Sequence, residues 1–304
     1  MTGATVKADV DVNTDFVESR LLRNASTRGA LHARALRLTS QGKYSQATTA
    51  FQGAISLANA RSPSDRGPLA AILNDFGVLS KYAGRFARAK RLYERAMELM
   101  PREHPQFEEF RATLYHNLAG LEQARGQNMR ALFYARRGIR LRRKSRGRGR
   151  LSLAADRAAL ATILVELGRL REAEKIHLQV LRLYRRAFGP KHYETASLLS
   201  NLGALHVKAG RLDAAELTLC RAAIALESAL GENHPRLASV LNNLAIAYAH
   251  NGKFSEADAT YSRALRLLER QPAPTYPRIG MVAAARKELY RKLKASRRVS
   301  RNGS

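Results

Sequence analysis

A glycine recurs every 42 residues along most of this chain, and no other feature constrains the fold as strongly. An alanine follows each glycine by five residues, from Ala47 to Ala257. Apolar residues on both sides of the glycine recur at helical spacing, which predicts two amphipathic helices joined at a tight corner. Six such pairs predict a repeat array that stacks into a solenoid. The glycines are Gly42, Gly84, Gly126, Gly168, Gly210 and Gly252.

The stretch Asn201–Leu226 shows this pattern most clearly. Gly210 falls where its first helix must end, because glycine adopts the left-handed backbone conformation without a side-chain penalty. Ala215 and Ala222 are small where two helix backbones would touch. We expect its apolar residues to form one buried stripe per helix: Leu202, Leu205, Leu212, Leu217, Leu219 and Ile224.

The repeated positions resemble the tetratricopeptide repeat. They include a small residue before the corner, the glycine itself, alanines five and twelve residues later, and an aromatic nine residues later, as at Phe51, Tyr93 and Tyr261. The period exceeds the usual roughly 34 residues and is similar to that of kinesin light chains. The resemblance covers Gly29 to Arg270. It implies an all-α, right-handed α-solenoid of about six helix-turn-helix repeats with a C-terminal capping helix.

The pattern also predicts how the chain is divided. Residues 1–14 should be a disordered head, 15–270 a six-repeat solenoid, and 271–304 a capping helix and basic tail. Repeat four departs most from the pattern, with Asp156 at an apolar position and His177 at an aromatic one. We therefore expect the weakest stacking between repeats three and four. The repeats lie near 29–60, 69–100, 107–144, 151–188, 193–230 and 235–270.

The formal net charge is +28, and much of it gathers in two places. Residues 136–150, an Arg-rich junction called here the arginine block, carry +9, and residues 278–301 carry +8. Three interpretations stay open for the block: a solvated linker, a dock for an acidic protein, or a non-specific contact with nucleic acid or anionic membrane. Its basic residues are Arg136, Arg137, Arg140, Arg142, Arg143, Lys144, Arg146, Arg148 and Arg150.

In tetratricopeptide proteins the first helix of each repeat lines a concave groove, and the resemblance carries those positions onto this chain. Asparagine recurs in one register at Asn117, Asn201 and Asn243, where its amide can pair both backbone groups of an extended peptide. The alternative is that these asparagines are only tolerated on a helix surface. The predicted groove residues are Asn74, Lys81, His116, Asn117, Gln123, Asn201, Lys208, Asn242, Asn243 and His250.

No catalytic, metal or cofactor motif is recognisable. The histidines are scattered, and His116 and Asn117 beside Asp75 would form an acid–base site only in a groove open to water. No apolar run is long enough to span a membrane, and the single cysteine, Cys220, fits a reducing cytoplasm. We expect a non-catalytic adaptor that binds a peptide or helix of an acidic partner protein, with no cofactor. The alternative is a basic scaffold on RNA, DNA or anionic membrane. The oligomeric state stays open.

Overall fold

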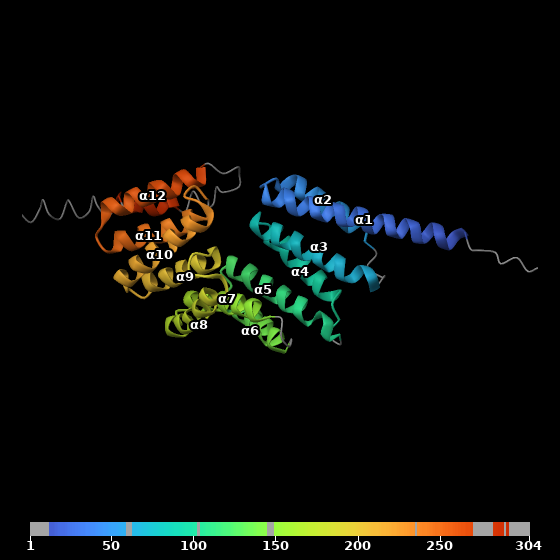
Figure 1. The fold of residues 1–304 in the computed structure, drawn as a ribbon, viewed down its shortest axis with the longest axis horizontal. Coiled ribbons are helices and arrows are strands. Elements are labelled where there is room, and N and C mark those ends of the chain that lie inside the picture. Colours follow the sequence, from blue (N-terminus) through green and yellow to red (C-terminus); the bar gives the residue numbers. More distant parts are fainter. Residues whose placement is uncertain are drawn as a thin grey trace, which may run out of the picture. The chain divides into compact units, whose positions relative to one another are not determined.

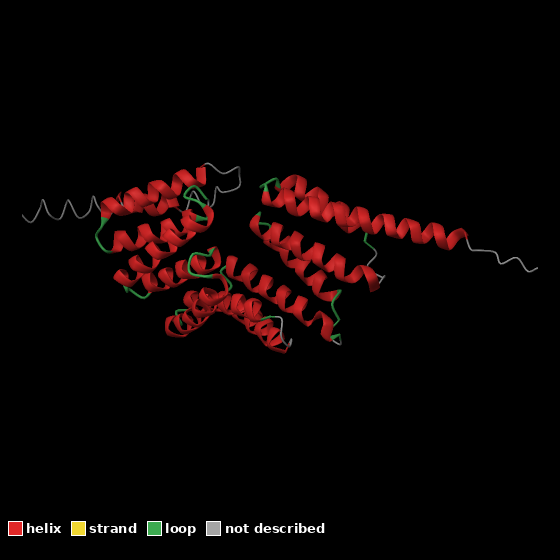
Figure 2. Ribbon diagram, viewed as in Figure 1, coloured by secondary structure: helices red, strands yellow, loops and turns green. Residues whose placement is uncertain are grey.

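The protein is described here from a computed structural model, which covers residues 12–58, 63–101, 104–144, 149–234, 236–269, 282–288 and 290–291. Every regular element among these residues is a helix (Figure 2). The expected all-α class is therefore confirmed. The chain divides into two compact units, Met1–His104 and Pro105–Ser304; Figure 1 labels their helices.

The part of the first unit that the structure describes contains two helical pairs. Its core holds the fully buried Ala47 and the rings of Phe51 and Phe76, whose centroids stack 5.2 Å apart. A salt bridge of 2.7 Å joins Arg28 of the first helix to Asp65 of the third. The four helices are α1 (Val12–Ser40), α2 (Tyr44–Ser56), α3 (Pro63–Tyr82) and α4 (Phe86–Glu98).

The described residues of the second unit include four helical pairs. In each pair the two helices pack on one another, and the second helix also packs on the first helix of the next pair. A short 3₁₀ turn, Pro105–Phe107, precedes them. The helices are α5 (Glu108–Ala124), α6 (Asn128–Lys144), α7 (Arg150–Glu166), α8 (Leu170–Phe188), α9 (Tyr193–Lys208), α10 (Leu212–Leu230), α11 (Leu237–His250) and α12 (Phe254–Glu269).

The corner between the helices of a pair is the same in all six pairs. Each of the six periodic glycines has a φ between 70° and 75°. At Gly210 the backbone N–H of Gly210 donates to Val207 O at 3.0 Å and that of Arg211 to His206 O at 3.0 Å. These two bonds satisfy carbonyls at the end of α9 that would otherwise lack partners. The predicted corner is confirmed at every repeat.

Small residues lie where the paired helices approach most closely. The alanines five residues after each corner are fully buried, Ala47 through Ala257. Gly203 of α9 shows how close the approach is, since a Cβ atom there would lie 2.4 Å from Leu219 Cγ. Small side chains therefore set the distance between the helices of a repeat, as the pattern predicted.

Charged side chains join successive repeats near the corners of the second unit. The acid six residues after one corner glycine pairs with the base one residue after the next: Glu174 with Arg211 at 2.9 Å, and Glu216 with Lys253 at 2.7 Å. We call these two pairs the corner ladder. Hydrogen bonds from the basic partners lower the pKa of both carboxyls. Asp258, the next acid in this register, pairs with Arg286 at 2.7 Å.

A helical segment covering residues 282–288 and 290–291 lies where the capping helix was expected. Val282 is buried in the core that α11 and α12 share, and Tyr290 Oη donates to Asp258 at 2.8 Å. The rest of the expected cap and tail, 271–304, lies outside the described residues. So do residues 1–11 of the expected disordered head, and α1 begins at Val12.

Candidate peptide-binding groove

The first helices of the four pairs in the second unit form one continuous layer. Helix α7 contacts α5 and α9, and α9 contacts α11. Predicted groove residues on α5 and α9 form hydrogen bonds directly to α7. Gln123 Nε2 of α5 donates to Thr162 Oγ1 of α7 at 3.3 Å, and Lys208 Nζ of α9 donates to Glu166 Oε2 of α7 at 3.1 Å. The groove positions of consecutive repeats therefore share one face.

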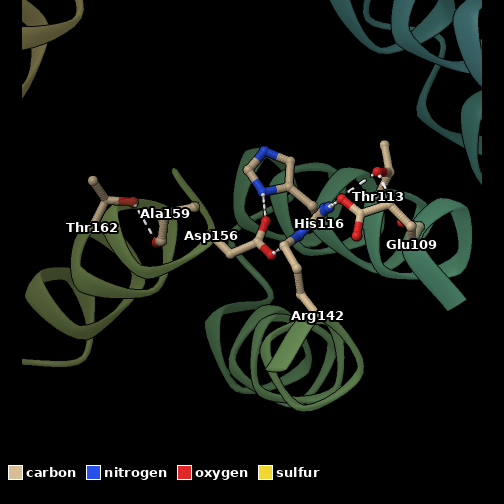
Figure 3. Close-up of polar contacts among 7 residues, drawn as sticks. All are labelled: Glu109, Thr113, His116, Arg142, Asp156, Ala159 and Thr162. Carbon is tan, nitrogen blue, oxygen red and sulfur yellow. Dashed lines mark hydrogen bonds and ion pairs between the residues drawn. The ribbon is translucent and has the colours of Figure 1, made fainter. Parts of the chain in front are cut away.

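His116 lies on this face and is held from below by Asp156. His116 Nδ1 is 2.9 Å from Asp156 Oδ1, and Arg142 Nε donates to Asp156 Oδ2 at 2.6 Å (Figure 3). Arg142 also donates through Nη1 to Glu109 at 2.5 Å and through Nη2 to Thr113 at 3.2 Å. We call these five residues the seam network, because they join repeats three and four. The imidazole is fixed in orientation by a carboxylate that is itself neutralised by a guanidinium.

The seam network bears on two expectations. We expected the weakest stacking at this junction, and the structure places a buried ion pair there, with both side chains 5% exposed; the strength of the stacking stays a prediction. The sequence also raised an acid–base site of His116 with Asp75, and each of these side chains has a partner within its own unit. Asp75 belongs to the first unit and lies 2.8 Å from His32 Nε2, whereas the partner of His116 is Asp156. Sequence reasoning treated Asp156 only as a departure from the pattern and missed its pairing.

The asparagines of the second unit differ in exposure. Asn201 is exposed on α9, and Asn117 and Asn243 are partly exposed on α5 and α11. Asn242 is buried, and its Oδ1 has no hydrogen-bond partner among the described residues. His250, at the C-terminal end of α11, is exposed. Three of the predicted amides are therefore accessible, whereas Asn242 is covered.

Asn74 and Lys81 lie on α3 in the first unit. Asn74 is buried, and its Nδ2 donates to Asp75 Oδ1 at 3.1 Å. Lys81 is partly buried, which lowers its pKa, and its ammonium lies 5.0 Å from the centroid of the Tyr82 ring. Lys81 is therefore the more accessible of the two predicted groove residues in this unit.

The arginine block differs from its prediction in two ways. Residues up to Lys144 belong to helix α6, so this part of the block is not a linker. Arg142 is buried in the seam network, so it was wrongly assigned to an anionic partner. Arg137 is partly exposed, and Arg146 and Arg148 lie outside the described residues. The exposed basic side chains are Arg136, Arg140, Arg143, Lys144 and Arg150.

Two residues of the predicted apolar stripe on α10 do not face the core. Leu217 is 54% exposed and Ile224 is 66% exposed, whereas Leu219 is fully buried. The interpretation of all apolar residues as one stripe was therefore wrong for this helix. His177 takes the aromatic position of repeat four and is fully buried, and within the described part of the chain neither ring nitrogen has a hydrogen-bond partner. Burial lowers its pKa to about 4.

Family models decide the identity of the array. One tetratricopeptide repeat model matches residues 110–185, 152–223 and 217–270, and a second tetratricopeptide repeat model matches residues 69–102. The chain is a tetratricopeptide repeat protein. No curated protein matches this sequence.

Solved structures place this tetratricopeptide repeat protein near kinesin-light-chain-like members in fold. BtubC (BKLC) from P. vanneervenii is 22% identical with a TM-score of 0.56, covering 84% of this chain and 94% of that one. A putative kinesin light chain from Podosopora anserina is 21% identical with a TM-score of 0.51, covering 68% and 96%. The Cut9-Hcn1 structure of APC/C is 15% identical with a TM-score of 0.62, covering 91% and 46%. The expected tetratricopeptide repeat family and the α-solenoid fold are both confirmed.

Two absences concern only the part of the chain that the structure describes. None of the helices there is long and apolar enough to cross a membrane. No three histidine, cysteine or acidic side chains in the described ranges are placed to hold a metal ion. Cys220 is a partly buried free thiol, with Sγ 3.7 Å from Tyr248 Oη.

Proposed function

We propose that this tetratricopeptide repeat protein is a non-catalytic adaptor that binds an extended segment of a partner protein on the layer formed by α5, α7, α9 and α11. The family membership supports a role in protein–protein interaction. The observation that carries the proposal is the pair of links from Gln123 to Thr162 and from Lys208 to Glu166. They align the polar groove positions of successive repeats, as recognition of a continuous backbone requires.

The side chains of this layer are suited to binding a peptide backbone. Asn117, Asn201 and Asn243 occupy one register on successive helices, apart from Ala159 on α7. Each amide can donate to a carbonyl and accept from an N–H, so the three read the backbone without selecting side chains. Because Asp156 fixes the ring of His116, the groove also presents an imidazole in one orientation.

The partner segment is proposed to be acidic. The chain carries 53 basic and 25 acidic residues. A positive field of this size raises association rates with acidic partners at low salt. The proposed location is the cytoplasm, because the unpaired thiol of Cys220 fits a reducing compartment. The rival function is a basic scaffold on nucleic acid or anionic membrane. It predicts binding that does not need the groove residues and that, for nucleic acid, is lost after nuclease treatment.

Site-specific photo-crosslinking tests the groove. A benzophenone amino acid at Asn201 should crosslink a segment of another protein, and the yield should survive nuclease treatment. The matched control places the same group at Ser228, which is exposed on the second helix of the same repeat. Replacing Asn117 and Asn243 by alanine should lower the yield at position 201 several-fold. Equal yields at 201 and 228, or products that vanish after nuclease treatment, would refute the proposal.

A further inference from the structure

The exposed face of α6 combines apolar and basic side chains in a single row. Met129 is 69% exposed and Phe133 is 56% exposed, in the first half of the helix. Arg136, Arg140 and Arg143 continue the row and are exposed. These residues are separated by three or four positions, so they lie one above another on the same side of the helix. We call this row the α6 outer face.

The seam network fixes which side of α6 faces outward. Arg142 is the one arginine of the helix turned into the core, where it meets Asp156 and Glu109 (Figure 3). Ala131, Gly138 and Ile139 are buried with it on the inner side. The α6 outer face therefore lies away from the seam network. Helix α6 is the second helix of repeat three. The proposed groove lies on first helices, so the two surfaces are different.

Phe133 is held in place although its ring is exposed. The ring packs edge-on against Tyr134, with centroids 5.4 Å apart, and the Arg137 guanidinium lies 5.9 Å from it. Arg137 also lies 5.3 Å from the ring of Tyr115 on α5, which anchors the guanidinium to the helix pair. An aromatic side chain with its orientation fixed loses little entropy on binding, which favours a role as an anchor.

The charge of this face is not balanced within the described part of the chain. Helix α6 contains no acidic residue, and Arg136, Arg140 and Arg143 make no ion pair there. The helix dipole accounts for basic residues in the last turn only. Arg136 and Arg140 lie further back, and the dipole does not explain exposed Met129 and Phe133. A face with these properties fits an external partner.

We propose that the α6 outer face is a second docking surface, and that it binds an acidic amphipathic segment of another protein. Arginine, methionine and aromatic residues are enriched in protein interfaces, whereas lysine is depleted there. The row has this composition over about 21 Å of helix. Apolar side chains of the segment would cover Met129 and Phe133, and its carboxylates would pair with the guanidinium groups of Arg136, Arg140 and Arg143.

Nucleic acid fits this face less well. Phosphate contacts need only positive charge, which does not account for the exposed Met129. Single-stranded nucleic acid is bound by several aromatic platforms in succession, and Phe133 is the one strongly exposed ring in the row. The charge pattern and the apolar pair together select a protein segment.

Fluorescence anisotropy with a defined probe tests the proposal. The probe is a labelled helical peptide that carries leucine and phenylalanine at one end and glutamates along the rest of the same face. Full-length protein should bind it more tightly than a scrambled peptide of the same composition. Arg140→Glu should weaken binding by about tenfold, the size expected near the centre of an interface. Phe133→Ala should weaken it to a similar extent.

Repeat-equivalent positions supply matched controls. Arg182 lies at the position of Arg140 in the next repeat, and it is exposed on α8. Leu217 lies at the position of Phe133 two repeats later, and it is exposed on α10. Arg182→Glu and Leu217→Ala should leave binding within about twofold, because they change the same charge or apolar area elsewhere. Circular dichroism and thermal melts verify that all four variants are folded.

Several outcomes would overturn the proposal. Equal effects of Arg140→Glu and Arg182→Glu would mean that bulk charge alone attracts the probe. Equal binding of the scrambled peptide, or no binding by the wild-type protein, would refute an amphipathic partner. Tighter binding to an oligothymidine strand or to phosphatidylserine vesicles would assign the face to another class of ligand. The Asn201→Ala variant should bind the probe normally, so failure of the groove proposal and failure of this one are distinguishable.

Discussion

The junction between repeats three and four and the junction between repeats five and six solve the same packing problem with different chemistry. At the first junction, Arg142 and Asp156 form a buried ion pair. Their repeat-equivalents at the second junction are Leu226 and Val240, which are 2% and 3% exposed in an apolar core. Both pairs are separated by 14 residues. The register of the solenoid is therefore set by backbone spacing and small residues, and it accepts either an apolar or a charged pair.

The first prediction breaks the charged junction alone. Asp156→Val leaves the Arg142 guanidinium buried with Glu109 and Thr113 but without its main counter-ion. Removing one partner of a buried pair costs roughly 3–5 kcal/mol, so the denaturant midpoint of the second unit should fall strongly. Urea unfolding followed by circular dichroism measures this change.

The double variant Arg142→Leu with Asp156→Val copies the apolar junction into the charged one. Replacing a buried ion pair by apolar residues of similar volume is often neutral or stabilising. The double variant should therefore recover the stability of the wild-type protein or exceed it. If the double variant is as unstable as Asp156→Val, the two positions do not form an interchangeable pair.

The second prediction concerns His177, which takes the position held by Phe51, Tyr93 and Tyr261 in other repeats. Burial lowers its pKa from 6.5 to about 4. The unfolded chain therefore binds a proton at a pH where the folded chain does not, and stability falls as pH decreases from about 6.5 to about 4. The full effect is roughly 3 kcal/mol.

A His177→Phe variant isolates this contribution from the other seven histidines. Its stability should fall less than that of the wild-type protein across the same pH range, as measured by urea unfolding at several pH values. Parallel curves for the two proteins would show that His177 does not carry the linkage. The charged seam network is present in both proteins, so its contribution to stability cancels in the difference.

The repeat pattern predicted the parts of the fold that recur, and it failed where one repeat departs from the others. Corner glycines and buried alanines could be predicted because the same backbone geometry is imposed six times. The pairing of Arg142 with Asp156 could not, because it occurs once and joins residues from different repeats. A signal did exist: opposite charges replace apolar residues at positions 14 residues apart.

The candidate site was only partly predictable for a related reason. Periodicity gives the spacing of side chains on a helix but not which side is covered. Leu217 and Ile224 share the spacing of core residues, yet they lie on the outer side of α10, which its neighbours do not cover. The exposed row on α6 was missed in the same way, since the arginine block was defined by its charge and began after Phe133. Which of these side chains are buried could be learned only from the structure.

The third prediction compares two close contacts between the paired helices of one repeat, at Gly203 in repeat five and at Gly138 in repeat three. Gly203→Ala puts a Cβ atom 2.4 Å from Leu219 Cγ, whereas a Cβ atom at Gly138 would lie 3.2 Å from Ala112 O and Tyr115 Cβ. Overpacking at Gly203 should cost about 1–3 kcal/mol. At Gly138 the strain is smaller and is offset by the higher helix propensity of alanine. Thermal melts should show the larger decrease for Gly203→Ala, and the reverse order would contradict this account.

The smallest effect is expected from the corner ladder, which joins the repeats at the surface. Glu216→Ala removes the partner of Lys253, but a solvated pair contributes less than about 1 kcal/mol. Because the pKa of Glu216 is lowered by Lys253, this contribution is present above the normal carboxyl pKa and is lost as pH falls through the lowered value. The difference from the wild-type protein should also shrink at high salt. The loss from Asp156→Val should persist in salt because that pair is buried, so equal salt dependence of the two variants would remove the distinction between the junctions.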